Sequence, residues 1–329
     1  MNDAALRRAW HPVCYAADLK DAPKGARLLG EPVVVWRDAA GAPRAMRDRC
    51  PHRGTALSLG TLVSGELVCP YHGWRFAADG RCTHIPQLQD PSRVPERACV
   101  DTWRCEEKLG LIWVALEAPR WSVPEVAEFS DPAWRVVRTG PFDWHAHASR
   151  QLENFTDFGH FAFVHQGLLG DPSKPVVAAH EVQSQGPVLR YAYGRPDQAN
   201  TAKLPVFAAE ERKSELRRTR YAVHLPFTLI EHIDWGGPDG MVYVFVSQPV
   251  DAERCIGYCM VARNYQHEQP ETVMQDFERV IFEQDRRIIE SQPKGPVPLE
   301  GSSELHMAFD KVALAYRRAL REHGFGSEP

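Results

Sequence analysis

Short apolar runs, separated by glycine and proline, fill the first third of the chain. These runs lie at residues 33–36, 61–69, 99–105 and 111–115, with Gly65 inside the second and Gly110 before the last. Short strands with this punctuation are typical of a small antiparallel barrel or sandwich. The first third is therefore predicted to be all β.

The pattern changes beyond an acidic, proline-bearing stretch at 117–134. Strands are predicted at 176–183, 189–193, 218–224, 241–247 and 255–263. Helices are predicted at 271–292, at 304–321 and in part of 150–165. This order favours an α+β arrangement, one antiparallel sheet covered by helices. We expect one domain at 1–118, a linker at 119–134 and a second domain at 135–329.

Composition narrows the class of protein. The 329 residues are enough for two domains. Charged residues make up 25% of the chain and hydrophobic residues 43%, which is typical of globular proteins and excludes fibrous and disordered classes. The net charge of −4 argues against a dedicated nucleic-acid binder. The longest apolar runs are too short to span a membrane, and the N-terminus lacks the apolar stretch of a signal peptide. We expect a cytoplasmic protein, whose cysteines bind metal or act in catalysis rather than forming disulfides.

Two short clusters carry metal-ligand chemistry. The chain reads C-P-H-R-G at 50–54 and C-P-Y-H-G-W at 69–74, so each cluster offers one thiolate and one imidazole, from Cys50, His52, Cys69 and His72. Two sulfur and two nitrogen ligands suit tetrahedral zinc, or a [2Fe–2S] cluster with the cysteines on one iron and the histidines on the other. The order Cys-His, Cys-His fits the iron–sulfur cluster better, and zinc remains the alternative.

These two clusters resemble the fingerprint of the Rieske family, and the resemblance covers roughly residues 9–116. It implies a Rieske [2Fe–2S] domain at the N-terminus. Rieske domains of quinol-oxidising complexes carry an additional disulfide between the two ligand loops, where this chain has Thr55 and Tyr71. That difference favours the oxygenase or ferredoxin branch of the family.

A second group of metal-capable side chains follows at Asp157, His160 and His165, embedded among apolar residues. At roughly 100° per residue, the two histidines would lie roughly 140° apart on a regular helix. We therefore expect the helix to break or bulge near 159–163, so that both imidazoles face one point.

Asp285 is the candidate third ligand. It lies on the apolar stripe of the predicted helix at 271–292, which is formed by Met274, Phe277, Ile281 and Ile288. A carboxylate on a buried face needs a metal or a partner, and Glu278, Glu283 and Glu290 are less well placed on this stripe. Two histidines and one carboxylate form the facial triad of non-haem Fe(II) oxygenases. The alternatives are satisfied core histidines and an ion pair of Asp285 with a neighbouring arginine.

The second half resembles the catalytic domain of the Rieske non-haem iron oxygenase α subunit, a helix-covered sheet of START/Bet v1-like fold. The resemblance rests on E-N-x-x-D-x-x-H-x-x-x-x-H, from Glu153 to His165, and on Q-D-R-x-I-x-E-x-Q at 284–292. It implies that His160, His165 and Asp285 bind mononuclear Fe(II). It also implies that Asp157 links a ligand histidine to a Rieske histidine of a neighbouring subunit, and that Asn154 lies close to the iron.

The expected function is that of a terminal oxygenase component. The chain is most similar to the vanillate, dicamba and N-methylxanthine demethylases, so we expect monooxygenation of a small aromatic or heteroaromatic substrate with O₂, leading to O- or N-demethylation. Ring or side-chain hydroxylation is the alternative. A Rieske electron carrier with a non-catalytic binding domain, and a zinc-stabilised binding module, are remote alternatives. After a predicted strand, His232, Asp234 and Trp235 are candidates for lining the substrate pocket.

The expected partners follow from what the sequence lacks. There is no G-x-G-x-x-G after a strand and no P-loop motif. Electrons are therefore expected from a separate NAD(P)H-dependent reductase, with flavin and its own [2Fe–2S] cluster, or from a ferredoxin. Arg53, Arg75 and Arg81, near the Rieske ligands, are candidates for docking this partner, and an ordinary solvated surface is the alternative. The resemblance also implies a homotrimer, and neither a nucleic-acid nor a membrane partner is expected.

Overall fold

The computed structural model describes residues 3–196, 216–234, 238–301 and 304–326. The chain divides into two compact units between Val123 and Pro124. The predicted bounds at 1–118, 119–134 and 135–329 stay a prediction.

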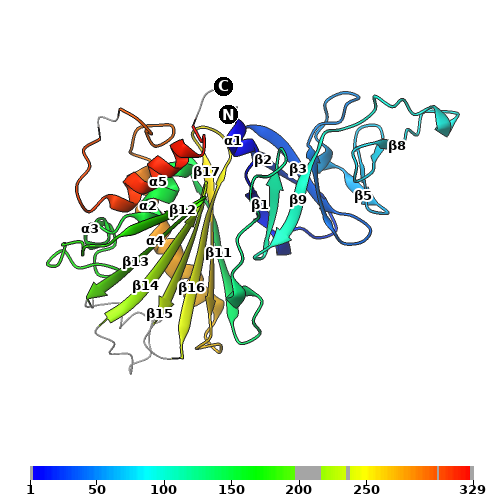
Figure 1. The fold of residues 1–329 in the computed structure, drawn as a ribbon. Coiled ribbons are helices and arrows are strands. Elements are labelled where there is room, and N and C mark those ends of the chain that lie inside the picture. The colour runs from blue at the N-terminus through cyan, green and yellow to red at the C-terminus, as the bar shows by residue number, and fades with distance from the viewer. Residues whose placement is uncertain (1–2, 197–215, 235–237, 302–303, 327–329) are drawn as a thin grey trace. The chain divides into compact units, whose positions relative to one another are not determined.

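The first unit consists of antiparallel sheets (Figure 1). A six-stranded sheet has the order β1-β10-β9-β4-β3-β2, with β1 His11–Tyr15, β2 Lys24–Leu28, β3 Glu31–Arg37, β4 Pro43–Arg47, β9 Thr102–Lys108 and β10 Leu111–Ala115. A four-stranded sheet has the order β5-β6-β7-β8, with β5 Thr61–Val63, β6 Glu66–Val68, β7 Arg75–Phe76 and β8 Cys82–His84. A short helix, α1 Ala4–Arg7, precedes β1.

The apolar run at 33–36 forms the buried centre of β3. Trp36 is fully buried, and its indole N–H donates to the carbonyl of Gly65 at 2.9 Å. Gly65 turns β5 into β6 with φ +81°, and a Cβ there would meet the backbone nitrogen of Ala39 at 2.2 Å. A glycine is therefore required where this hairpin approaches the chain beyond β3.

The second unit is a seven-stranded antiparallel sheet with helices packed against it (Figure 1). The strand order is β11-β17-β16-β15-β14-β13-β12, with β11 Arg135–Trp144, β12 Val182–Gln185, β13 Val188–Pro196, β14 Leu216–His224, β15 Thr228–Asp234, β16 Gly240–Pro249 and β17 Cys255–Arg263. The helices are α2 Ala148–Thr156, α3 Phe161–Val164, α4 Glu271–Ile289 and α5 Lys311–Glu322. The predicted α+β class is confirmed.

Three predicted elements have different limits in the structure. The strand expected at 176–183 begins only at Val182, because the N–H of Ala178 is bound by the hydroxyl of Tyr193 instead of a strand partner. The helix expected at 304–321 begins at Lys311, because the preceding segment places Glu304 against arginines. The helix expected at 271–292 ends at Ile289, which takes the buried position, while Ile288 is 48% exposed.

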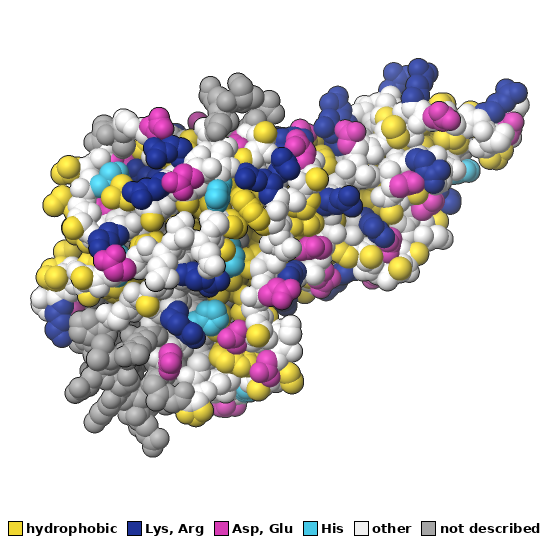
Figure 2. Space-filling model, in the orientation of Figure 1, with side chains coloured by type: hydrophobic (Ala, Val, Ile, Leu, Met, Phe, Trp, Pro, Cys, Tyr) yellow, Lys and Arg dark blue, Asp and Glu magenta, His cyan; other side chains and the backbone are white. Residues whose placement is uncertain are grey.

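Basic and acidic side chains are interspersed over the face drawn in Figure 2. This pattern agrees with the small net charge of −4. Among the described residues, no helix is long and apolar enough to cross a membrane.

Candidate functional site

Two loops of the first unit present the four predicted Rieske ligands. One loop follows β4, where the N–H of Cys50 donates to Thr55 and that of Gly54 donates back to Cys50. The other lies between β6 and β7, where Cys69 and Gly73 repeat the pattern, with Trp74 accepting from Cys69. The two loops therefore have the same backbone hydrogen bonding, and each holds its cysteine inside a tight turn.

The histidine rings of these loops lie side by side. The rings of His52 and His72 are 4.5 Å apart, and Trp74 stacks on His52 at 4.6 Å. Cys50 and Cys69 are each 2% exposed, and burial, together with the neighbouring Cys69, raises the pKa of Cys50 to about 11. Buried thiols beside two adjacent imidazoles fit a cluster bound by two thiolates and two imidazoles.

In the second unit, the chain breaks between α2 and α3. Helix α2 ends at Thr156, Asp157 is extended, and α3 begins at Phe161. The break thus spans residues 157–160 and overlaps the start of the region predicted to break, 159–163. It turns His160 and His165 toward one another, with their ring centres 5.1 Å apart.

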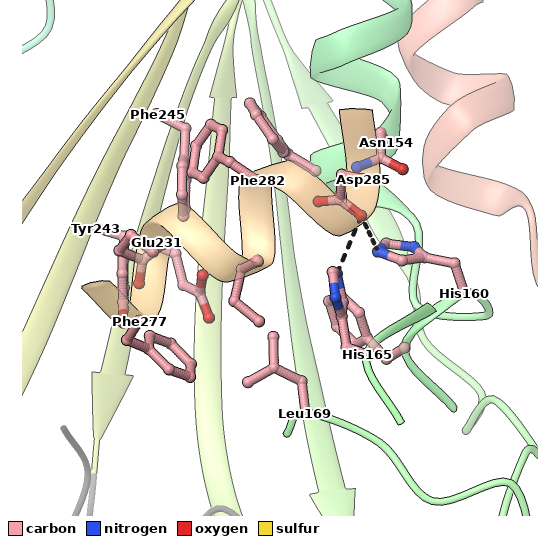
Figure 3. A pocket seen from close by; sticks show the side chains of 14 residues that line it. Asn154, His160, His165, Leu169, Glu231, Tyr243, Phe245, Phe277, Phe282 and Asp285 are labelled. Atoms are coloured by element: carbon pink, nitrogen blue, oxygen red, sulfur yellow. Dashed lines mark ion pairs between the residues drawn. The ribbon is translucent and has the colours of Figure 1, made fainter. Parts of the chain in front are cut away.

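Asp285 of α4 completes a compact three-residue group. Its Oδ1 lies 3.1 Å from Nε2 of His165 and 3.6 Å from Nε2 of His160 (Figure 3). All three ligand atoms lie within 4.8 Å of one another. The structure therefore brings together the three side chains predicted as mononuclear iron ligands.

The donor set of this group fits a metal ion. Both Nε2 atoms and Oδ1 of Asp285 are buried and make no hydrogen bond within the described chain. Buried polar atoms left in that state are costly, and a bound cation would satisfy all three. Two imidazoles and one carboxylate suit ferrous iron and leave positions open for other ligands.

Neighbouring side chains orient these ligands. Nδ1 of His165 donates to the carboxamide oxygen of Gln284 at 2.8 Å, and Nδ1 of His160 lies 3.3 Å from Oδ2 of Asp157. Such partners fix the ring orientation of a metal-bound histidine. The pKa of Asp157 is lowered, because the hydrogen bond and charge of His160 outweigh the effect of burial.

A cavity opens at this group, between α4 and the sheet (Figure 3). Its aromatic and aliphatic walls are Phe155, Phe161, Leu169, Tyr243, Phe245, Phe277, Ile281 and Phe282. Asn154 also lines it, as expected for a residue near the metal, and its Nδ2 is buried without a hydrogen-bond partner in the described chain. A mostly apolar pocket with few polar groups suits a small planar ligand.

Two acidic residues of this pocket were missed from the sequence. Glu278 was judged less well placed than Asp285, yet it is 3% exposed and lines the cavity. A spacing of seven residues is about two helical turns, so this signal was present in the sequence. Glu231 of β15 also lines the cavity. No strand was predicted at this position, so the sequence did not indicate which side chains would face the pocket.

The predicted pocket residues of β15 lie elsewhere. His232 does not line the cavity, because side chains alternate along a strand and its neighbour Glu231 faces that side. Nε2 of His232 instead lies 3.4 Å from a carboxylate oxygen of Glu128. Asp234, at the end of β15, is exposed and also does not line the cavity. Trp235 lies outside the described residues.

Comparisons with known proteins cover both units. Residues 9–104 match the Rieske [2Fe-2S] domain, and residues 144–323 match the vanillate O-demethylase oxygenase C-terminal domain. Methylxanthine N1-demethylase NdmA of Pseudomonas putida is 35% identical over 96% of this chain and 89% of its own length. Methylxanthine N3-demethylase NdmB of the same organism is 32% identical, with the same coverage.

Solved structures agree with these relationships. The structure of Pseudomonas putida NdmA with caffeine superposes with a TM-score of 0.86, at 32% identity, covering 97% of this chain and 91% of that one. Dicamba monooxygenase bound to dicamba has a TM-score of 0.82 and covers 97% of each chain, and at 21% identity it supports the fold alone.

Proposed function

This chain belongs to the Rieske non-haem iron oxygenases, and from that premise we propose that it removes a methyl group from the nitrogen or oxygen of a small heteroaromatic or aromatic substrate. As a member of the family it is an oxidoreductase with a Rieske [2Fe–2S] cluster and a mononuclear iron, and it uses O₂ and electrons from a reductase or ferredoxin. The observation that carries the proposal is the 35% identity to an N-demethylase over 96% of the chain, together with the cavity beside His160, His165 and Asp285.

Geometry and donor chemistry support a proposal for the metal ligands. His160, His165 and Asp285 would hold the mononuclear iron, and Cys50, His52, Cys69 and His72 would hold the cluster. When bound, the cluster delivers electrons and the iron activates O₂. Electron delivery would thus depend on four side chains of the first unit, and activation of O₂ on three side chains of the second unit.

The remaining side chains of the pocket position the substrate and exclude water. The rings of Phe245, Phe277 and Phe282 form walls that favour a planar molecule, while Asn154 offers a buried N–H donor close to the metal ligands. Gln284 accepts the proton of Nδ1 of His165 in a hydrogen bond, so that Nε2 would offer its lone pair to the metal.

The atoms and electrons of the proposed demethylation balance as follows. One atom of O₂ enters a methyl C–H bond, and the other leaves as water after taking two electrons and two protons. The hydroxymethyl group separates as formaldehyde, and a hydrogen takes its place on nitrogen or oxygen. Hydroxylation of a ring or side chain, in which the new hydroxyl stays on the product, is the alternative outcome.

The electron donor and the assembly are proposed from exposed side chains near the two candidate metal sites. The Asp157 side chain is 40% exposed while it contacts His160, which supports a link to the Rieske histidine of a neighbouring copy in a homotrimer. Arg53 is exposed beside the cluster loop, and with Arg75 it would meet an acidic, NAD(P)H-dependent reductase or a ferredoxin; Arg81 is paired with Asp79 at 2.6 Å. The predicted cytoplasmic location stays a prediction.

The test is a single-turnover reaction of reduced, iron-loaded protein with O₂ and a panel of N-methyl and methoxy aromatics. We expect formaldehyde in amounts equal to the methyl groups lost. The Asp285→Asn variant, which loses a ligand of the iron, should release none. A hydroxylated product without formaldehyde would replace demethylation by hydroxylation.

A further inference from the structure

The substrate cavity contains two carboxylic acids besides the metal ligand Asp285. Glu231 enters from β15 and is half-buried, and Glu278 enters from α4 and is 3% exposed. No lysine or arginine is among the described residues that line this cavity. The described lining therefore supplies two further acidic side chains and no basic one.

Both carboxylic acids are held by tyrosine hydroxyls. The hydroxyl of Tyr221 donates to Glu231 at 3.2 Å, and that of Tyr243 donates to Glu278. Burial raises the pKa of Glu278 to about 8; the hydrogen bond from Tyr243 opposes this rise, and the charges of Glu231 and Asp285 add to it. With this pKa, Glu278 is mostly protonated at neutral pH while the cavity is empty, and the hydrogen bond from Tyr243 orients it. A cation in the cavity would stabilise the charged form of both acids.

Most of the apolar cavity wall is aromatic. Tyr243 and Phe245 stack with parallel rings 5.3 Å apart, and Phe277 and Phe282 of α4 also line the space (Figure 3). Aromatic faces attract cations, and cages of such rings are a common way of binding methylated ammonium groups. Carboxylates together with aromatic rings thus favour one chemical class of ligand.

We propose that this cavity selects substrates in which the N-methyl nitrogen carries a positive charge, with Glu278 and Glu231 as the specificity-determining residues. This inference rests on the demethylase function proposed above and specifies its substrate class. For a quaternary nitrogen, the hydroxymethyl group leaves as formaldehyde, the nitrogen keeps the electron pair of the broken N–C bond and becomes neutral, and the hydroxyl proton is released. O₂ and the reductase supply the oxidant and the two electrons.

Binding of a matched pair of probes tests the selection. The cation trimethylphenylammonium and its neutral carbon analogue tert-butylbenzene have the same shape, and their affinities would be measured by anaerobic calorimetry on the full, metal-loaded chain. We expect the cation to bind at least tenfold more tightly. Glu278→Gln keeps the shape of the side chain and an acceptor for Tyr243, and it should reduce this preference at least fivefold. Glu231→Gln should act in the same direction.

The control is Asp276→Asn, an exposed acid on the same helix whose side chain is 67% accessible. It should leave the tenfold preference unchanged, which separates a local effect of Glu278 from the loss of any negative charge. Equal binding of the two probes, no binding of either, or a preference that survives in both glutamine variants would overturn the inference. In that case, formaldehyde released from neutral substrates in the single-turnover assay would still support the demethylase function. If no methylated compound releases formaldehyde, the demethylase function itself is refuted.

Discussion

Gln284 is expected to set the iron affinity of the second unit without touching the iron. Its carboxamide oxygen accepts a hydrogen bond from Nδ1 of His165 at 2.8 Å, while Nε2 of the same ring lies 3.1 Å from Asp285. Because His165 is only 1% exposed, water cannot take the place of this acceptor. Replacing Gln284 by leucine would leave a buried N–H without a partner and free the ring to change its tautomer.

The size of the effect follows from this contact. Loss of the partner of a ligand histidine typically weakens metal binding about 10- to 100-fold. This corresponds to about 1.4–2.7 kcal/mol of binding free energy. Gln284→Glu, which keeps an acceptor oxygen at the same place, should retain more affinity than Gln284→Leu.

The assay is competition for Fe(II) between the protein and a calibrated chelator, with the absorbance of the Rieske cluster as an internal measure of intact protein. Asp276→Asn, on the exposed face of α4, is the matched control and should bind iron like the original chain. An iron affinity of Gln284→Leu equal to that of the control would refute the reasoning, because it would show that the Nδ1 contact does not orient the ligand.

Four further changes test other parts of the account. Arg317→Met removes a buried cation that binds Glu153 at 2.5 Å and Glu304 at 2.6 Å, and it should lower the unfolding free energy of the second unit by about 3 kcal/mol in urea titrations. Asp157→Asn should leave both metal contents unchanged and abolish turnover; retained activity would contradict the proposed link. Arg53→Glu with Arg75→Glu should slow cluster reduction by the reductase at low salt in stopped-flow measurements, and an unchanged rate would exclude docking there. Burial lowers the pKa of His147 from 6.5 to about 4, so the unfolded chain binds this proton more readily, and the free energy of unfolding of the second unit should fall by about 1.6 kcal/mol between pH 6.5 and 5. His147→Asn should remove that loss.

The sequence predicted the parts of the site that depend on short motifs. The two Cys-His clusters lie within a few residues each, and their loops need only local hydrogen bonds, such as that of Cys50 with Thr55. His160 and His165 were also recognisable, because a five-residue spacing on a helix requires a break, and α2 does end at Thr156. Asp285 was predicted because a carboxylate on an apolar helix face needs a partner.

The polar side of the pocket could not be predicted in the same way. Whether Glu231 or His232 faces the cavity depends on the register of β15 against β16, where Glu231 pairs with Tyr243, and a shift of one residue reverses the two faces. Strand β15 itself was not predicted. Glu278 is the exception: it lies seven residues, about two helical turns, before Asp285 on α4, so its place on the buried face could have been predicted from the helical period.

The iron content per chain tests the central claim most directly, that this is an oxygenase with a mononuclear iron held by His160, His165 and Asp285. Iron and acid-labile sulfide would be measured on the reconstituted protein and on Asp285→Asn. The account predicts about three irons and two sulfides per chain in the original protein, and about two of each in the variant. About two irons in both proteins, with the Rieske absorbance intact, would contradict the claim and would leave an electron carrier with a non-catalytic binding domain.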